Sequence, residues 1–233
     1  KVRIPRHRRE QWGAQESRLS RAEIMEKLNR ENLLPAITFI FSRMGCDAAV
    51  KQCLTAGLKL TNTEERAEIL KTAERYTANL PEEDLEVLGY REWITALERG
   101  IAAHHAGLLP SFKNAIEDLF QRGLVKAVFA TETLALGINM PARTVVFDNI
   151  KKHDGKQFRT LLPHEYIQMA GRAGRRGLDS TGTVIILCKS EVYDMAELHS
   201  MMKGKPTQLE SKFRLTYSMI LNLLRVEQLR VED

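Results

Sequence analysis

The amino-acid sequence predicts an α/β protein built around a doubly wound, mostly parallel sheet. After residue 99, short apolar runs of strand length alternate with longer segments of helical periodicity. The strand-like runs are almost continuously apolar, which is typical of strands covered on both faces of a parallel sheet. With 233 residues, 43% of them hydrophobic, the chain is long enough to bury one substantial core.

The elements can be assigned in order along the chain. Ser20 and Glu23 match a capping box, which predicts a helix that runs to about Asn32. Residues 61–99 are charged and helical in pattern, with a cap expected at Thr61, and are interpreted as a helical insertion on the outside of the domain. The other expected elements are a strand at 35–42, a helix at 44–56, a strand at 100–105, a helix at 109–123, a strand at 125–131, a helical turn at 134–137, a strand at 143–149, a helix at 162–174, a strand at 181–188 and a helix at 191–202.

The two ends of the chain differ from this central domain, which is expected to span residues 20–203. Residues 1–19 are interpreted as a basic arm or linker, because nine Lys and Arg against four Glu in residues 1–30 account for the net charge of +5. Such an arm could contact nucleic acid or be a solvated linker. One more helix is expected at 214–227, and its apolar face has no remaining segment to cover it. Residues 204–233 are therefore expected to be a linker and the start of a neighbouring domain.

Composition argues against several classes of protein. No apolar run approaches the roughly 18 residues that a membrane span needs, and the charged first ten residues do not resemble a signal peptide. We therefore expect a soluble, intracellular protein with no membrane partner. Cys46, Cys53 and Cys188 form no CxxC pair, so we expect buried small hydrophobes rather than metal ligands or redox groups.

Polar residues follow three of the expected strands at the point where each strand ends. Ser42 and Arg43 follow the first, the segment 104–107 (HHAG) follows the second, and Thr131 begins the segment after the third. Ligands gather outside the carboxyl ends of parallel strands, so these groups are candidates to bind phosphates. Ordinary strand-end turns are the alternative. The two adjacent histidines should point in different directions, and no Glu or Cys stands at ligand spacing, so no metal site is expected.

The stretch QMAGRAGRRGLD, residues 168–179, threads arginines between glycines. If it is placed on a helix, Gln168, Arg172 and Arg175 share one narrow face. Gly171 and Gly174 lie away from that face and are expected to let the backbone pack closely against a neighbouring element. Two convergent guanidinium groups match the oxygens of a phosphate, as in phosphoryl transfer. A generic basic loop that touches nucleic acid is the alternative.

A second segment, residues 130–147, supports a nucleotide site. It joins two strands by a connection that is too short for a full crossover helix. Within it, Gly137 permits close approach of the backbone, and Asn139 offers an amide to a ribose or phosphate. Packing alone is the simpler explanation for this segment. Taken together with the arginines, it is interpreted as one lip of a nucleotide cleft.

At these residues the sequence resembles a known family. The stretches FSR, HHAGLLP, ATETLALGINMPARTVVF and QMAGRAGRRGLDSTGTVI resemble the second RecA-like domain of superfamily 2 DExH-box helicases, in the superkiller-type branch of RNA helicases. The resemblance runs from about Leu34 to the end and is weakest over 61–99. The stretch FRLTYSMILNLLRVE resembles the segment where that family enters its winged-helix domain.

The resemblance implies a role for each matching position. Contacts to the RNA backbone are implied for Ser42, Arg43, Gly107 and Thr131, nucleotide contacts for Gly137 and Asn139, and motif VI roles for Gln168, Arg172 and Arg175, with both arginines as γ-phosphate fingers. The family implies ATP with Mg²⁺ as cofactor, RNA as substrate and 3′-to-5′ polarity. It also suggests a partner complex that contains an RNA-degrading exonuclease, and a location in the cytoplasm, or in the nucleus of a eukaryote.

Two elements of such an ATPase are not found in the sequence. Gly-Lys occurs at 155–156 and 204–205 without a following Ser or Thr, and no Asp is followed by Glu. The family carries both elements in its first RecA-like domain, expected before Lys1. The chain by itself is therefore predicted to be inactive, with the first RecA-like and winged-helix domains of the same protein as partners. A DNA-directed helicase of a related branch and a non-catalytic RNA-binding module are the alternatives.

Overall fold

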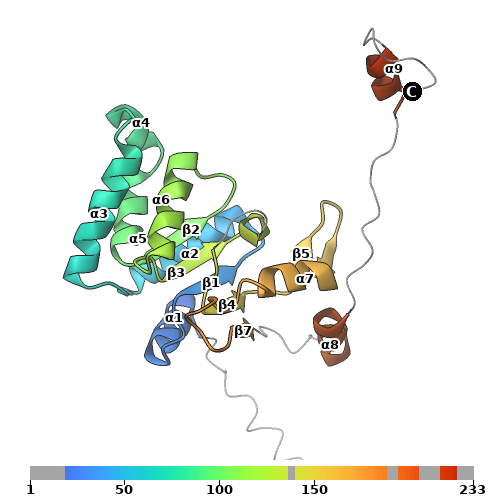
Figure 1. Cartoon of the computed structure of the whole chain (residues 1–233), viewed down its shortest axis with the longest axis horizontal. Helices are drawn as coiled ribbons and strands as arrows, with labels where there is room; N and C mark the ends of the chain where they lie inside the picture. The colour runs from blue at the N-terminus through green and yellow to red at the C-terminus, as the bar shows by residue number, and fades with distance from the viewer. Residues whose placement is uncertain (1–18, 136–139, 188–193, 205–215, 225–233) are drawn as a thin grey trace, which may run out of the picture.

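The computed structural model describes residues 19–135, 140–187, 194–204 and 216–224. Within these residues, five strands form a central sheet in which every neighbouring pair is parallel (Figure 1). In order across the sheet they are β2 (Ile101–His104), β3 (Ala127–Ala130), β1 (Ala36–Phe39), β4 (Thr144–Phe147) and β7 (Thr183–Ile186). The predicted α/β class and parallel sheet are confirmed.

Helices cover both faces of this sheet, because side chains along each strand alternate between two apolar clusters. Ile37 and Phe39 of β1 belong to one cluster, whereas Ala36 and Ile40 belong to the other. The first cluster also holds side chains from α3 (Thr63–Thr77), α5 (Tyr90–Glu98), α6 (Pro110–Gln121), α7 (Pro163–Ala170) and α8 (Met195–Lys203). The second holds side chains from α1 (Arg21–Arg30) and α2 (Arg43–Thr55). The predicted doubly wound arrangement is therefore confirmed.

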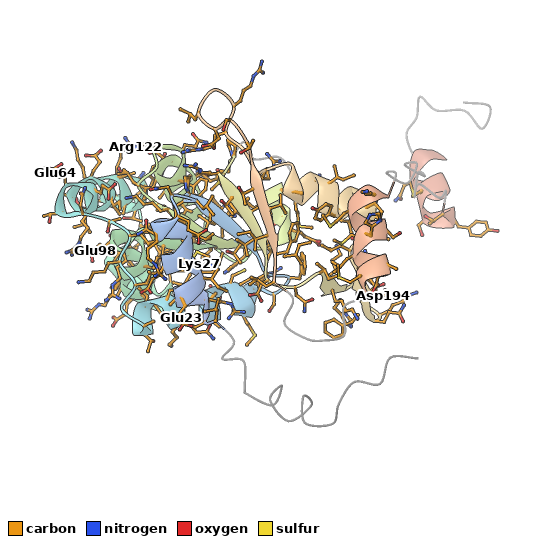
Figure 2. All side chains as sticks on the ribbon, turned by 90° about the horizontal axis from the view of Figure 1, so that it is seen from below. Glu23, Lys27, Glu64, Glu98, Arg122 and Asp194 are labelled. Carbon is orange, nitrogen blue, oxygen red and sulfur yellow. The ribbon has the colours of Figure 1, made fainter. Side chains whose placement is uncertain are left out.

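Helix α1 begins as the sequence predicts. The Ser20 hydroxyl accepts a hydrogen bond from the Glu23 backbone N–H at 3.2 Å, and the Glu23 carboxylate accepts one from the Ser20 backbone N–H at 2.6 Å. Met25 and Leu28 are buried, while Glu23 and Lys27 lie on the exposed side of the helix (Figure 2). A capping box followed by apolar residues at helical spacing thus orients the helix on the sheet.

The helical insertion differs from the prediction in two respects. Its first helix, α3, is capped by Asn62, whose side-chain oxygen accepts from the Glu65 N–H at 2.8 Å, while the expected cap Thr61 donates its hydroxyl to the Glu98 carbonyl. The insertion also completes the core instead of lying outside it, because Ile69 of α3 is fully buried. The short helix α4 (Glu82–Val87) joins α3 to α5.

An antiparallel hairpin that the sequence analysis did not assign lies beside α7 (Figure 1). It consists of β5 (Lys151–His153) and β6 (Phe158–Thr160). Asp154 and Gly155 form its turn: the Asp154 carboxylate accepts two backbone N–H groups at 2.9 Å, and Gly155 has φ +99°. An Asp-Gly pair is a known hairpin signal. One of the two Gly-Lys pairs in the sequence is therefore part of a hairpin turn.

The remaining expectations concern the cysteines and the chain ends. Cys46 and Cys53 are fully buried, and burial raises the pKa of their thiols to about 12 and about 11, which confirms their assignment as core residues. Cys188, the arm before residue 19 and most of the expected linker lie outside the described residues. A helix, α9 (Tyr217–Leu224), lies where one was predicted. Among the described helices, none has the length and apolar character to cross a membrane.

Candidate functional site

The carboxyl ends of β2, β3 and β1 lie side by side at one edge of the sheet. The register places His104 opposite Ala130, and Ala130 opposite Phe39. The main chain continues this pairing beyond the strands, because the Thr131 N–H donates to the His104 carbonyl and the Ile40 N–H donates to the Ala130 carbonyl. The three polar segments predicted from the sequence therefore emerge from adjacent strands, as expected. We call this region the carboxyl edge, defined by Ser42, Arg43, Gly107 and Thr131.

Arg43 and Gly107 are brought together at the carboxyl edge. A Cβ atom at Gly107 would lie 3.5 Å from Cδ of Arg43 and 3.1 Å from Nδ1 of His105, so the absent side chain leaves room for both neighbours. Arg43 itself is exposed. Ser42 begins α2, and its hydroxyl accepts the Gly45 N–H at 3.2 Å. The arginine is thus carried on the first turn of a capped helix, next to a glycine whose backbone it can approach.

The two adjacent histidines point to different helices, as predicted. Nε2 of His104 lies 2.9 Å from the Glu117 carboxylate on α6, whereas Nε2 of His105 lies 2.9 Å from the Asp47 carboxylate on α2. Burial lowers the pKa of His104 despite the opposing effect of Glu117. The Gly107 N–H donates to Nδ1 of His105 at 3.1 Å. These histidines therefore position the segment after β2.

Thr131 lies between the end of β3 and the short helix that follows it. Its hydroxyl is 2.9 Å from the hydroxyl of Thr133, and a short 3₁₀ helix, η3 (Glu132–Ala135), begins at the next residue. This helix begins two residues before the helical turn predicted at 134–137, of which residues 136 and 137 lie outside the described part of the chain. Gly137 and Asn139, the two residues assigned to the nucleotide side, lie outside the described residues.

The segment that carries the arginines is not helical beyond residue 170, which corrects the prediction of a helix over 162–174. Helix α7 ends at Ala170, and Ala173 instead forms a parallel bridge with Ala142. Gly174 has φ +91°, outside the helical region, and its N–H donates to the Ala142 carbonyl at 2.7 Å. The N–H groups up to Ala173 still bond back to α7, and from Gly174 the chain bonds to a second segment instead.

This change of conformation alters the predicted arrangement of the arginines. Gln168 stands on α7 and is exposed, whereas Arg172 and Arg175 lie in the segment 171–179, which we call the arginine turn. The three side chains do not share a face of one helix, and that prediction was wrong. Arg172 is placed by a long-range hydrogen bond to the Ala135 carbonyl, and Arg175 by Asp179 within the turn.

Arg172 joins the arginine turn to both ends of the segment that contains Gly137 and Asn139. Its guanidinium Nη2 donates to the Ala135 carbonyl, and its own carbonyl accepts the Ala142 N–H at 2.8 Å. The two segments that were assigned to one nucleotide cleft are therefore neighbours in space. Their adjacency supports that interpretation, although the residues between Ala135 and Met140 lie outside the described part of the chain.

Arg175 is held by a residue to which the sequence analysis gave no role. Its Nε and Nη2 donate to the two carboxylate oxygens of Asp179 at 2.8 and 2.9 Å, and its backbone N–H donates to the same carboxylate at 3.0 Å. The Asp179 side chain is only 4% exposed. The Arg175 hydrogen bonds lower the pKa of Asp179 to about 2. The spacing of four residues between opposite charges was the available signal.

The glycines around the arginine turn differ in their contacts. A Cβ at Gly174 would lie 3.3 Å from the backbone of Gly182, which precedes β7, so the predicted close approach is confirmed there. The atom nearest to a Cβ at Gly171 is the Ile167 carbonyl oxygen of its own helix, at 3.0 Å, so that glycine does not serve a neighbouring element. The turn is thus seated against the start of β7 through Gly174.

Gln168 lines a cavity of about 220 Å³ between α7, η3 and the hairpin. The walls also include Glu132, Lys152 and Glu165. Lys152 forms ion pairs with both glutamates, at 2.8 Å to Glu165. Burial would raise the pKa of Glu165, but hydrogen bonds from Arg159 and Lys152 lower it to about 2. This network fixes the helix that carries Gln168 to the segment that follows Thr131.

Comparisons with known proteins identify the family to which the sequence is similar. The sequence model of the family described as helicase conserved C-terminal domain matches residues 52–177. The chain is 54% identical over 223 residues to Superkiller complex protein 2 of Mus musculus, covering 96% of this chain and 18% of that protein. It is 52% identical over 204 residues to the probable helicase HelY of Mycobacterium tuberculosis, covering 88% of this chain and 22% of that protein. It is 45% identical over 210 residues to the ATP-dependent RNA helicase mtr4 of Schizosaccharomyces pombe, covering 90% of this chain and 18% of that protein. The chain thus spans about a fifth of the length of these relatives.

Proposed function

The chain belongs to the helicase conserved C-terminal domain family, in its superkiller-type branch, and on this premise we propose that it acts as the second motor domain of an ATP-dependent RNA helicase. The observation that carries the proposal is the arginine turn. It places Arg172 and Arg175 within one short segment, hydrogen-bonded to both flanks of the segment that contains Gly137 and Asn139. Two guanidinium groups within one short segment suit the oxygens of a nucleoside triphosphate.

In this role the arginines act on a phosphate that another domain holds. When a γ-phosphoryl group is transferred, negative charge is spread over its oxygens, and an arginine supplied from outside the phosphate-binding domain can raise the rate about 10³–10⁵-fold. We assign to Gln168, on the last turn of α7, the role of orienting the reacting groups. Gly137 and Asn139 are assigned to contact the nucleotide.

The carboxyl edge is proposed as the RNA-binding surface. Ser42, Arg43, Gly107 and Thr131 offer a hydroxyl, a guanidinium, a free backbone approach and a second hydroxyl. Groups of these kinds contact phosphate and sugar oxygens and fix the register of a strand without reading its sequence. RNA and ATP are thus assigned to different parts of the same domain.

The cofactor is proposed to be ATP with Mg²⁺. The donors of the arginine turn fit the phosphates, because guanidinium groups bind phosphate oxygens in pairs. The described residues contain no group of three or more His, Cys, Asp or Glu side chains that could hold a metal ion. We therefore assign the Mg²⁺ ligands to a first RecA-like domain, where the ion would neutralise charge between the phosphates.

The wider context follows from the same proposal. We assign the chain a first RecA-like domain and a winged-helix domain as intramolecular partners, with α9 as the beginning of the latter. A relative carries the name Superkiller complex protein 2, which supports membership of a multiprotein complex, and we propose an RNA-degrading exonuclease within it. We propose 3′-to-5′ movement on RNA and a cytoplasmic, or in a eukaryote also nuclear, location.

The proposal is tested by the ATPase activity of the complete protein in the presence of RNA or DNA single strands of the same sequence. We expect strong stimulation by RNA, weaker stimulation by DNA, and negligible turnover by the 233-residue chain alone. Equal or greater stimulation by DNA would favour a DNA-directed helicase, since the 2′-hydroxyl distinguishes the two strands. Tight RNA binding without turnover by the complete protein would favour a non-catalytic RNA-binding module.

A further inference from the structure

We propose that Asp179 is a positioning residue for Arg175. It accepts hydrogen bonds from one edge of the guanidinium group, so that the other edge is directed at the nucleotide. The inference rests on the proposed function, because it assigns Arg175 to the γ-phosphate. It adds a residue whose role is to aim that arginine, without contacting the nucleotide itself.

The geometry of the pair is the first support. Asp179 accepts Nε–H and Nη2–H of Arg175 through its two oxygens, at 2.8 and 2.9 Å, in the side-on bidentate arrangement. The guanidinium has more N–H donors than one carboxylate can use, so Nη1 and one hydrogen of Nη2 remain for a second acceptor. The side chain of Arg175 is 26% exposed, which leaves part of it open to an incoming ligand.

The burial of Asp179 disfavours separation of the Arg175–Asp179 ion pair. The Asp179 side chain is 4% exposed, and a carboxylate removed from water is stable only while it keeps its charged partners. Among the described residues, Arg143 forms the other ion pair with Asp179, and its Nε lies 4.0 Å from the carboxylate. Separation of Arg175 from Asp179 would leave a buried charge with one distant partner. We therefore infer that Arg175 meets the phosphate while it is still bound to Asp179.

Arg143, which lies beside the Arg175–Asp179 pair, is hydrogen-bonded to the central sheet. The Arg143 N–H donates to the Pro35 carbonyl, which precedes β1, and the Arg143 carbonyl accepts the N–H of Thr183, the first residue of β7. The backbone N–H of Arg175 also donates to Asp179, so the carboxylate fixes the main chain and the side chain of the same residue. Through Asp179 and Arg143, the Arg175 guanidinium is thus linked to the starts of β1, β4 and β7.

The side-chain hydrogen bonds of Arg175 go to Asp179, a residue that can be substituted without changing the arginine. The positioning role is therefore tested at Asp179.

The experiment measures RNA-stimulated ATP hydrolysis by the complete protein and by three variants, Asp179→Asn, Arg175→Ala and the double variant. Because a misplacement of about 1 Å can cost about 10²-fold in rate, we expect Asp179→Asn to lower kcat about 10- to 100-fold, with a much smaller change in KM for ATP. We expect Arg175→Ala to lower kcat about 10³-fold. In the Arg175→Ala background, Asp179→Asn should have no further effect, since it acts only through the arginine.

Two controls exclude a loss of folding. Asp118→Asn weakens an ion pair of similar length but greater exposure, at 2.8 Å from Arg75, between α6 and α3, and should leave kcat unchanged. Asp179→Glu keeps the charge but moves the carboxylate by one methylene group. It should give a smaller loss of kcat than Asp179→Asn, which would show rescue by a conservative variant. The melting temperature of each variant is measured alongside.

The outcomes separate the two proposals. If Arg175→Ala retains wild-type kcat, the proposed function fails. If Arg175→Ala is inactive but Asp179→Asn has wild-type or increased kcat, the positioning role is overturned and the function stands. If Asp179→Asn lowers kcat by the same factor with and without Arg175, the residue acts independently of that arginine, and the positioning role is again overturned.

Discussion

The carboxyl edge and the arginine turn both present groups suited to phosphates, but the chain fixes them by different means. At the carboxyl edge, Arg43 and Thr131 stand directly after strands or at the start of a capped helix, so regular secondary structure places them. In the arginine turn, Arg172 and Arg175 follow the end of α7 and are placed by the distant Ala135 carbonyl and by the carboxylate of Asp179 within the turn itself. A surface that binds a strand by several weak contacts tolerates small displacements, whereas a group that acts on one reacting phosphate does not.

The largest expected effect is at the arginine turn. Arg172→Ala and Arg175→Ala should each lower the kcat of the complete protein by about 10³-fold, because the charge they stabilise develops in the transition state. The affinity for a non-hydrolysable ATP analogue should change far less. ATPase assays at saturating RNA, together with analogue titrations, check both statements. An unchanged kcat in either variant removes that arginine from the γ-phosphate.

Secondary-structure reasoning predicted the carboxyl edge well for a physical reason. Strand ends in a parallel sheet share one edge, so residues such as Arg43 and Thr131 were predicted to be close once their strands were found. The capping box at Ser20 and Glu23 was likewise visible, because cap and helix are neighbours in sequence. Short-range sequence patterns predict the strands and caps, and parallel pairing then brings the strand ends together at one edge of the sheet.

The same reasoning did not predict the arginine turn. The periodicity of Gln168, Arg172 and Arg175 is compatible with a helix, but Gly174 adopts a positive φ and bonds to Ala142, which lies 32 positions earlier. A long-range bridge of this kind has no counterpart in a pattern of neighbouring residues. The pairing of Arg175 with Asp179 was accessible in principle, since the two lie at a spacing of four residues.

The comparison can be sharpened by a change that moves the arginine turn without touching an arginine. A Cβ at Gly182 would lie 2.5 Å from the backbone C and O of Ala173, so Gly182→Ala should displace the turn and cost about 1–3 kcal/mol in the free energy of unfolding. The kcat should fall as well, because both arginines depend on that backbone. Urea unfolding and ATPase assays measure the two effects.

A second glycine serves as a control that separates the loss of stability from the fall in kcat. Gly57, at the end of α2, has φ +76° and nothing within 4 Å of a Cβ position, so Gly57→Ala introduces backbone strain of about 1 kcal/mol without overlap. It should lower stability and leave kcat unchanged. Wild-type stability and kcat in Gly182→Ala would show that the turn is not seated on β7.

The stability contributed by the arginine turn should depend on pH in acid, because the turn contains the Asp179 carboxylate. Asp179 has its pKa lowered from 3.8 to about 2 by Arg175, so its contribution to stability is present above pH 4 and is lost as pH falls through about 2. Between these values, the melting temperature of the wild type should fall more steeply than that of Asp179→Asn, with a difference of a few °C. Parallel pH profiles would show that the ion pair does not stabilise the fold.

The smallest expected effect is at the carboxyl edge. Arg43→Ala removes one exposed guanidinium from a surface with several phosphate contacts, so RNA affinity should fall by about 1 kcal/mol, or roughly fivefold. The loss should be similar for all RNA sequences, and the slope of log affinity against log salt should decrease by about one. The kcat at saturating RNA should remain that of the wild type, since the arginine turn is intact.

Lys51 provides the control for charge alone. It lies on the same helix as Arg43, about 12 Å further along, and its exposed ammonium group is 3.9 Å from Glu92. Lys51→Ala removes the same net charge away from the strand ends, so it should change RNA affinity less than Arg43→Ala does. Equal losses would mean that bulk charge, and not the carboxyl edge, attracts the RNA. A kcat defect in Arg43→Ala at saturating RNA would instead couple this edge to the arginine turn, and the two regions would then act as one site.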